Sequence, residues 1–218
     1  MPGPTDQSEG SAGAASVKDR VAHAVAMTVN PIVLVPIFFA WVLLDAGWPT
    51  RAVLDAVLLS TLFLSIAPVL VIVWMVRTGR AETIEVRARS RRGVPFFVAF
   101  LGGCAALGWS LLVDWPTGPL FEPLVGCFIV NTVLLAAVNT RFKISLHAAS
   151  VAGFVSMAAW LATGVVPALA IVLVPLVMWS RVQTGAHSLR EVVAGATYGL
   201  MVPIVELEVL QRAGWLVA

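Results

Sequence analysis

The sequence predicts an all-α fold, a polytopic transmembrane helical bundle of about six to seven spans with a short interfacial helix at its N-terminus. Of the 218 residues, 59% are hydrophobic and only 12% are charged, whereas a soluble domain has about 45–50% apolar and about 25% charged residues. The mean hydropathy is +0.93. The apolar residues form continuous runs, unlike the alternating strands of a membrane β-barrel. This composition excludes a solvated globule, a disordered chain and a nucleic-acid-binding protein.

The N-terminal region is polar and then becomes amphipathic. Residues 1–15 are predicted to be a disordered tail, because they contain no apolar run that could offset the entropy of ordering. Residues 16–30 combine valines and a methionine with Lys18, Asp19 and Arg20, a pattern typical of a helix at the membrane surface. We therefore predict a tail followed by one membrane domain, residues 16–218.

Seven apolar segments follow, and a span needs about 20 apolar residues. Polar turns, prolines and glycines end several of them, as at Asp114-Trp115-Pro116 and Gly164. The predicted segments are 31–47, 52–76, 94–113, 120–138, 145–161, 165–179 and 187–210. No repeat or linker divides them.

The basic residues are concentrated on one side of this predicted bundle. Seven crossings place the tail and the loops 77–93, 139–144 and 180–186 on one face. Of the 14 basic residues, all but Arg51 and Arg212 belong to that face, which leaves 12 there. Because loops rich in Lys and Arg remain in the cytoplasm, we predict an integral protein of a bacterial-type cytoplasmic membrane, with its N-terminus and basic loops inside.

Two histidines of this basic face are candidates for chemistry. His147 and His187 each stand where a basic loop enters a span. His187 and Glu191 are four residues apart, so their side chains meet on one side of a helix. A carboxylate that accepts from one imidazole nitrogen fixes the tautomer and makes the other nitrogen the better nucleophile. The alternative is an interfacial ion pair that only caps the last helix.

Cations beside both histidines indicate an anionic ligand. Arg181 offers a planar guanidinium suited to phosphate. Lys143 and Ser145 precede His147 at the start of a helix, where backbone N–H groups favour an anion and His147 is placed to protonate a leaving group. Six arginines lie in the loop 77–92, more than orientation requires. The alternative is a set of positive residues that only fixes topology or contacts lipid headgroups.

The segment around His187 resembles the third signature of the type 2 phosphatidic acid phosphatase superfamily. That signature is Ser-Arg, five residues, His, three residues and Asp, usually followed by Val-Leu-Ala-Gly. Ser180, Arg181 and His187 occupy the matching positions, and Glu191 stands in place of the Asp. Val-Val-Ala-Gly follows, ending at Gly195.

The other two signatures of that family are matched less closely. Ser145 and His147 resemble the Ser and His of its Pro-Ser-Gly-His signature, with Ile144 and Leu146 in place of Pro and Gly. The first signature of the family is a Lys followed after six residues by Arg-Pro, and Arg80 and Arg87 keep the spacing of its two cations. Arg89 and Arg92, followed by Pro95, look like the arginine-rich version of this signature in short bacterial relatives. The resemblance covers about residues 80–199.

The resemblance implies a phosphohistidine mechanism that needs no metal or other cofactor. His187 would attack phosphorus, His147 would protonate the departing alcohol, and Glu191 would orient His187. The groups implied to hold the phosphate are Arg181, Lys143, Ser145, Arg89 and Arg92.

The expected function is therefore that of a metal-independent lipid phosphate phosphatase. Its expected substrate is a lipid phosphate or diphosphate, an isoprenoid phosphate first and a phosphatidate-type lipid second. Two alternatives stay open: a non-catalytic binder or transporter of anionic lipid with a decayed site, and a lipid phosphotransferase that uses the same phosphohistidine.

Overall fold

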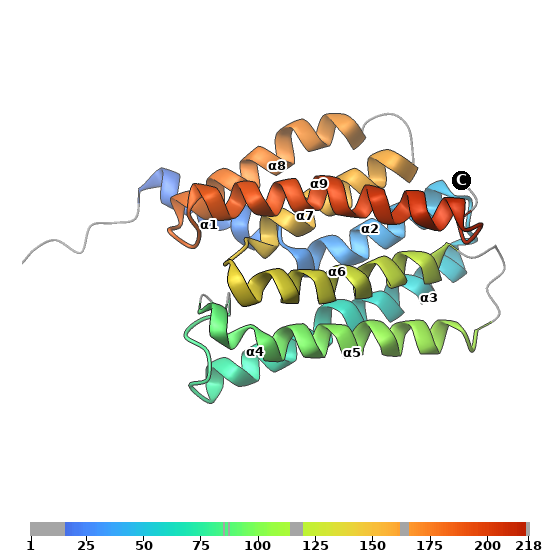
Figure 1. The fold of residues 1–218 in the computed structure, drawn as a ribbon, viewed down its shortest axis with the longest axis horizontal. Coiled ribbons are helices and arrows are strands. Elements are labelled where there is room, and N and C mark those ends of the chain that lie inside the picture. Colours follow the sequence, from blue (N-terminus) through green and yellow to red (C-terminus); the bar gives the residue numbers. More distant parts are fainter. Residues whose placement is uncertain (1–15, 85, 87, 114–119, 162–165, 217–218) are drawn as a thin grey trace, which may run out of the picture.

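The computed structural model is helical throughout the part that it describes, which covers residues 16–84, 86, 88–113, 120–161 and 166–216 (Figure 1). No strand occurs in these ranges, and the predicted all-α class is confirmed. The predicted tail of residues 1–15 lies outside the described residues. So do Arg87, the Asp114-Trp115-Pro116 turn and Gly164.

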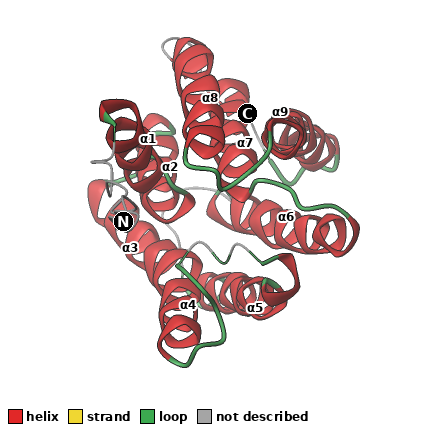
Figure 2. Ribbon diagram, turned by 90° about the vertical axis from the view of Figure 1, so that its left-hand side faces the viewer, coloured by secondary structure: helices red, strands yellow, loops and turns green. Residues whose placement is uncertain are grey.

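Each of the seven predicted apolar segments forms a helical rod, and one further helix precedes them. The elements are α1 (Val17–Thr28), α2 (Pro31–Asp45), α3 (Thr50–Ser60), the π-helical turn η1 (Thr61–Ile66), α4 (Ala67–Arg77), the 3-10 turn η2 (Arg89–Arg91), α5 (Gly93–Ser110), α6 (Phe121–Arg141), α7 (Leu146–Leu161), α8 (Val166–Gln183) and α9 (Leu189–Arg212). Viewed end-on, these helices surround the centre of the bundle (Figure 2).

Four described helices are long and apolar enough to cross a membrane, namely Thr50–Arg77, Arg89–Ser110, Phe121–Arg141 and Leu189–Arg212. The pair α1 and α2, bent by 50° at its break, makes a fifth candidate. The helix α7 and the segment Val172–Gln183 of α8 are apolar but shorter. The sequence predicts six to seven spans, and the four to five candidates among the described residues, together with the apolar helices α7 and α8, roughly fit that number.

The helix α1 is docked against the end of α8. Ser16 and Asp19 form a capping box at its start, which fixes the helix that the sequence predicts here. The Ser180 hydroxyl donates to the Ala22 carbonyl at 2.7 Å, and the Gln183 amide donates to Asp19 Oδ1 at 2.8 Å. These contacts hold the N-terminal helix beside the loop that carries His187.

The longest rod, α3–η1–α4, changes its winding in the middle. In η1 the Ala67 N–H donates to the carbonyl of Leu62, five residues back. Pro68 follows immediately and has no N–H to donate, and a wide π-helical turn accommodates such a break in the ladder. Leu64 and Ser65 from this turn line the central cavity described below.

Small residues let α7 and α9 lie very close together. A Cβ atom added at Gly199 would be 2.2 Å from the Ala149 carbonyl oxygen, and one at Gly195 would be 2.5 Å from that of Ser145. The Ser156 hydroxyl also donates to the Gly199 carbonyl at 2.8 Å. Close approach of this kind requires glycine at the contact points. It brings the first turns of α7 and α9 side by side.

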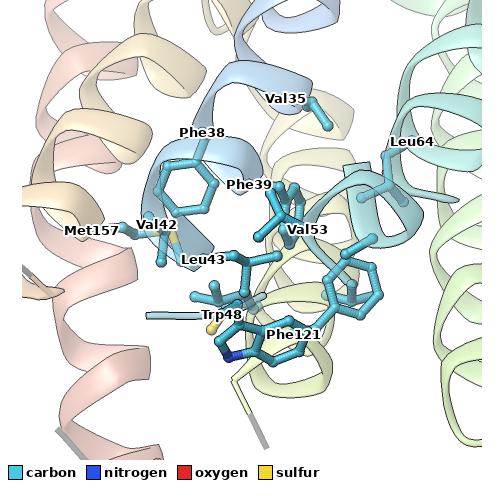
Figure 3. Close-up of a cluster of buried hydrophobic side chains, with 14 of the residues drawn as sticks. Val35, Phe38, Phe39, Val42, Leu43, Trp48, Val53, Leu64, Phe121 and Met157 are labelled. Carbon is cyan, nitrogen blue, oxygen red and sulfur yellow. The ribbon is translucent and has the colours of Figure 1, made fainter. Parts of the chain in front are cut away.

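Aromatic side chains form a buried cluster in the bundle, and two of them, Phe38 and Phe39, also line the central cavity. Phe38, Phe39, Leu43, Trp48 and Phe121 are all buried there (Figure 3). The rings of Phe39 and Phe121 are 5.0 Å apart between centroids, and those of Phe38 and Phe39 are 5.7 Å apart. The contact between Phe39 and Phe121 packs α2 against α6.

Candidate functional site

The loops that the sequence assigns to the basic face meet at one end of the bundle, at the left of Figure 1. Direct hydrogen bonds connect them. Arg92, at the start of α5, donates to the Ile144 carbonyl at 3.0 Å. Lys143, in the α6–α7 loop, donates to the Ala186 carbonyl of the α8–α9 loop at 3.0 Å. Residues that are far apart in sequence are thereby fixed around one point.

Glu191 is the centre of this arrangement. Its Oε2 atom accepts a hydrogen bond of 2.7 Å from Nδ1 of His187, and Nζ of Lys143 lies 3.5 Å from the same oxygen. It also accepts from the Ser188 N–H at 3.2 Å, while the Ser188 hydroxyl accepts from the Glu191 N–H at 3.4 Å. This capping box begins α9. The sequence spacing of four residues therefore does place His187 and Glu191 in contact.

His187 is held as a neutral imidazole. Its side chain is only 4% exposed, and this burial lowers its pKa from 6.5 to about 4, helped by the nearby charges of Arg92 and Lys143 and opposed by Glu191. Because a carboxylate only accepts, Nδ1 carries the ring proton. The other nitrogen, Nε2, then keeps its lone pair at neutral pH, as a nucleophile requires.

A cavity of about 360 Å³ begins at this imidazole and extends between the helices. His147, His187, Arg92 and Arg181 line it together. Most of its remaining wall is apolar, with residues from α2, η1, α4, α5, α6, α7 and α9. The cavity therefore combines a cationic, histidine-containing end with a hydrophobic body, as an amphiphilic ligand requires.

Arg92 is fixed by its surroundings before any ligand arrives. The residue is 4% exposed, and its Nε donates to the Val86 carbonyl at 2.9 Å. Its Nη1 lies 3.5 Å from the amide oxygen of Asn139. Val86 has a φ of 44°, which is unusual for a β-branched residue. Backbone strain of this kind often occurs at functional sites.

Arg181 is the second buried arginine of the cavity. It is 1% exposed and lies near the C-terminus of α8, after the apolar part of that helix. Its carbonyl accepts from the N–H groups of Ala186 and His187, at 3.2 and 3.1 Å. Gly185, with a φ of 64°, makes this tight turn possible. The turn holds Arg181 and His187 on the same wall.

Three predicted phosphate-binding residues, Ser145, Arg89 and Lys143, do not line the cavity. Ser145 is completely buried, and its hydroxyl accepts from the Ala148 N–H at 3.5 Å, so it caps the start of α7. Arg89 is exposed on η2 and lines a separate groove between α5 and α6. Lys143 reaches the site only through Glu191 and the Ala186 carbonyl. Arg92 and Arg181 are the arginines that share the cavity with both histidines.

The sequence analysis did not identify two groups of polar residues around the cavity. Asn139 holds Arg92 and donates to the Arg89 carbonyl at 3.3 Å. Deeper in the bundle, the Tyr198 hydroxyl donates to Asn131 at 2.8 Å, and the Asn131 amide donates to Glu206. Polar residues inside apolar segments are a recognisable signal, because they are costly there unless they are paired.

The described residues contain no group of three or more His, Cys, Asp or Glu side chains placed to hold a metal ion. No model of a known protein family matches the chain, and no curated protein or solved structure matches it either. Its residues and their geometry are therefore the basis for the function proposed below.

Proposed function

We propose that this protein is a membrane-embedded phosphatase that hydrolyses a lipid phosphate or diphosphate through a phosphohistidine intermediate. One observation carries the proposal. A neutral His187, with Nδ1 bonded to Glu191, lines the same cavity as His147, Arg92 and Arg181. The resemblance of residues 180–195 to the third signature of the type 2 phosphatidic acid phosphatases supports the same assignment.

The first half of the reaction transfers the phosphoryl group to the protein. Nε2 of His187 attacks phosphorus, and the bond from phosphorus to the lipid oxygen breaks. His147 gives its proton to that oxygen, so the lipid leaves as an alcohol or a lipid monophosphate. Arg92 and Arg181 neutralise the charge on the phosphoryl oxygens. Glu191 stabilises the positive charge that develops on His187.

The second half regenerates the protein. A water molecule attacks phosphorus and gives a proton to His147, which is neutral after the first half. The phosphorus–nitrogen bond breaks, inorganic phosphate leaves, and His187 returns to its neutral form with Nδ1 bonded to Glu191. No step requires a metal or an organic cofactor.

The hydrophobic body of the cavity supports a lipid rather than a soluble phosphate ester as the substrate. Apolar residues from several helices surround it, including Phe38, Phe154 and Met157. Burial of a hydrocarbon chain there contributes binding energy in proportion to the apolar area covered. An isoprenoid phosphate or diphosphate is the first substrate that we propose, and a phosphatidate-type lipid is the second.

Release of inorganic phosphate by the purified protein tests this proposal. Farnesyl phosphate, farnesyl diphosphate and dioleoyl phosphatidate are incubated in detergent with the wild type, His187→Ala and His23→Ala. His23 is exposed on α1, so its replacement is the matched control. We expect release that His187→Ala abolishes and His23→Ala preserves. A lipid that binds without phosphate release would instead support a binder or transporter, and turnover raised by an added acceptor alcohol would support a phosphotransferase.

We also propose that the site faces the cytoplasm. The site-bearing face carries 12 basic and six acidic residues, a formal +6, and the opposite face carries two basic and six acidic residues, a formal −4. Thr50 and Thr78 are exposed at opposite ends of the rod Thr50–Arg77. After replacement of Cys104 and Cys127, an impermeant thiol reagent on intact cells should label Thr50→Cys and spare Thr78→Cys. The reverse pattern would show the opposite orientation.

A further inference from the structure

A second hollow lies between α5 and α6, next to the cavity that contains the histidines. This groove has a volume of about 510 Å³. It is lined by Arg89, Ser90, Gly93, Phe96, Phe97, Phe100, Thr132, Val133, Ala136, Asn139 and Thr140. Phe96 and Thr132 line both hollows, but neither histidine lines the groove.

The groove has one polar end and one apolar end. Arg89, Ser90 and Thr140 are exposed at the polar end. From Gly93 to Phe100 the helix α5 advances by about 10 Å at 1.5 Å per residue. The groove therefore extends from the basic end of the bundle over about a third of a hydrocarbon core of about 30 Å.

The apolar part of the groove faces outward. Phe97 is 61% exposed and Val133 is 49% exposed, and both belong to helices long and apolar enough to span a membrane. Exposed apolar side chains at this depth contact the acyl chains of the surrounding bilayer. An outward-facing apolar groove with Arg89 at its polar end has the chemistry to fit a lipid whose headgroup lies at Arg89.

The charges at the polar end favour a net negative headgroup. None of the described residues that line the groove is acidic. Arg91 and Arg141 are exposed directly after Ser90 and Thr140 in the sequence, although Arg91 also pairs with Glu82 at 3.5 Å. Arginine binds phosphate oxygens through paired hydrogen bonds, and a zwitterionic headgroup would bring its own positive charge close to these side chains.

We propose that the α5–α6 groove binds the headgroup and upper acyl chain of a net anionic phospholipid from the bilayer. This lipid is held beside the histidine site and is not its substrate. The proposal is independent of the phosphatase activity, because none of its observations involves His147 or His187.

Native mass spectrometry of the detergent-purified protein tests this site with dioleoyl phosphatidylglycerol and dioleoyl phosphatidylcholine. The charge variants are Arg89→Gln and, as control, Arg20→Gln, which removes one exposed arginine of α1. The steric variants are Ala136→Phe, which fills the groove, and Ala137→Phe, which changes the neighbouring exposed residue outside it. A gel-filtration profile like that of the wild type shows that each variant is folded. If Ala136→Phe is not folded, Val133→Trp takes its place.

We expect the wild type to retain phosphatidylglycerol more strongly than phosphatidylcholine. Arg89→Gln should weaken phosphatidylglycerol binding about fivefold, as loss of one cation near an anionic surface implies, and Ala136→Phe should weaken binding at least as much. Both controls should change it less than twofold. Equal losses in Arg89→Gln and Arg20→Gln, an unchanged affinity in a folded groove-filling variant, or equal retention of the two lipids would each overturn the proposal.

Discussion

Replacement of Glu191 by Gln separates two roles that the same carboxylate combines. Its Oε2 atom accepts from His187 Nδ1 at 2.7 Å and from the Ser188 N–H at 3.2 Å. The amide oxygen of Gln can still accept both hydrogen bonds, so the start of α9 is preserved. The negative charge beside the imidazole is lost. Glu191→Gln therefore perturbs the electrostatics of His187 and leaves the helix cap in place.

The expected loss of activity follows from these contacts. A hydrogen bond to a charged group contributes about 1.5–3 kcal/mol, and a neutral one about 0.5–1.5 kcal/mol. The difference of about 1–1.5 kcal/mol predicts that Glu191→Gln slows phosphate release by at least about tenfold, since each 1.36 kcal/mol is a factor of ten in rate. In the phosphohistidine step His187 becomes positive. Unit charges about 4 Å apart attract by about 4 kcal/mol at an effective dielectric constant of 20, which sets the upper limit near a thousandfold.

Phosphate release under single-turnover conditions measures this effect, with Ser188→Ala as the matched control. Ser188→Ala removes the side-chain cap of α9 but leaves His187 and Glu191 unchanged. It should cost about 1 kcal/mol of stability and change the rate less than twofold. A loss of less than threefold in Glu191→Gln, or equal rate losses in the two variants, would refute the role of the carboxylate.

Three more predictions concern stability and chemistry. Burial lowers the pKa of His187 from 6.5 to about 4 in the folded protein, so between pH 6.5 and pH 4 the imidazole is protonated in the unfolded chain but neutral in the folded one. The contribution of His187 to the free energy of unfolding should therefore be fully present above about pH 6.5 and fall by up to about 3 kcal/mol toward pH 4. Thermal unfolding should show this fall in the wild type but not in His187→Gln. Gly199→Ala forces its Cβ against the Ala149 carbonyl and should lower the melting temperature. The control Gly108→Ala lies in open space within α5 and should leave the melting temperature unchanged or raise it. Equal effects of the two variants would contradict the close α7–α9 contact. Phosphate release should persist in EDTA and be inhibited by vanadate, and activity lost to EDTA and restored by zinc or magnesium would indicate a different mechanism.

Much of the fold can be predicted from hydropathy alone. The seven apolar runs correspond to the seven helical rods, and the amphipathic residues 16–30 correspond to α1. The number of full crossings is harder to predict. A run such as 145–161 is apolar throughout, and its described helix of 16 residues is close to the shortest length of a span. Close contacts between small residues, which hydropathy does not report, pack α7 against α9.

Sequence spacing predicts the site where the contacts are local. His187 and Glu191 meet across the N-terminus of α9, because His187 directly precedes the cap residue Ser188 and Glu191 is the third residue of the helix. For Arg89 and Arg92 local spacing is insufficient, because the short turn η2 sends one side chain outward and the other into the cavity. The role of Asn139 depends on a contact with Arg92 across 47 residues of sequence. No local pattern predicts a contact of that kind.

The burial of the individual cations bears on the orientation of the protein. Arginines that hold a ligand inside the bundle could inflate a count of positive residues without reflecting topology. Arg92 and Arg181 are buried and Lys143 is half-buried, and these belong to the site. Eight other described cations of the same face are exposed, namely Lys18, Arg20, Arg77, Arg80, Arg89, Arg91, Arg141 and Arg190. On the opposite face only Arg51 and Arg212 are basic. Eight exposed cations against two still favour a cytoplasmic site, so the expected labelling of Thr50→Cys, and not of Thr78→Cys, does not depend on the catalytic role of any arginine.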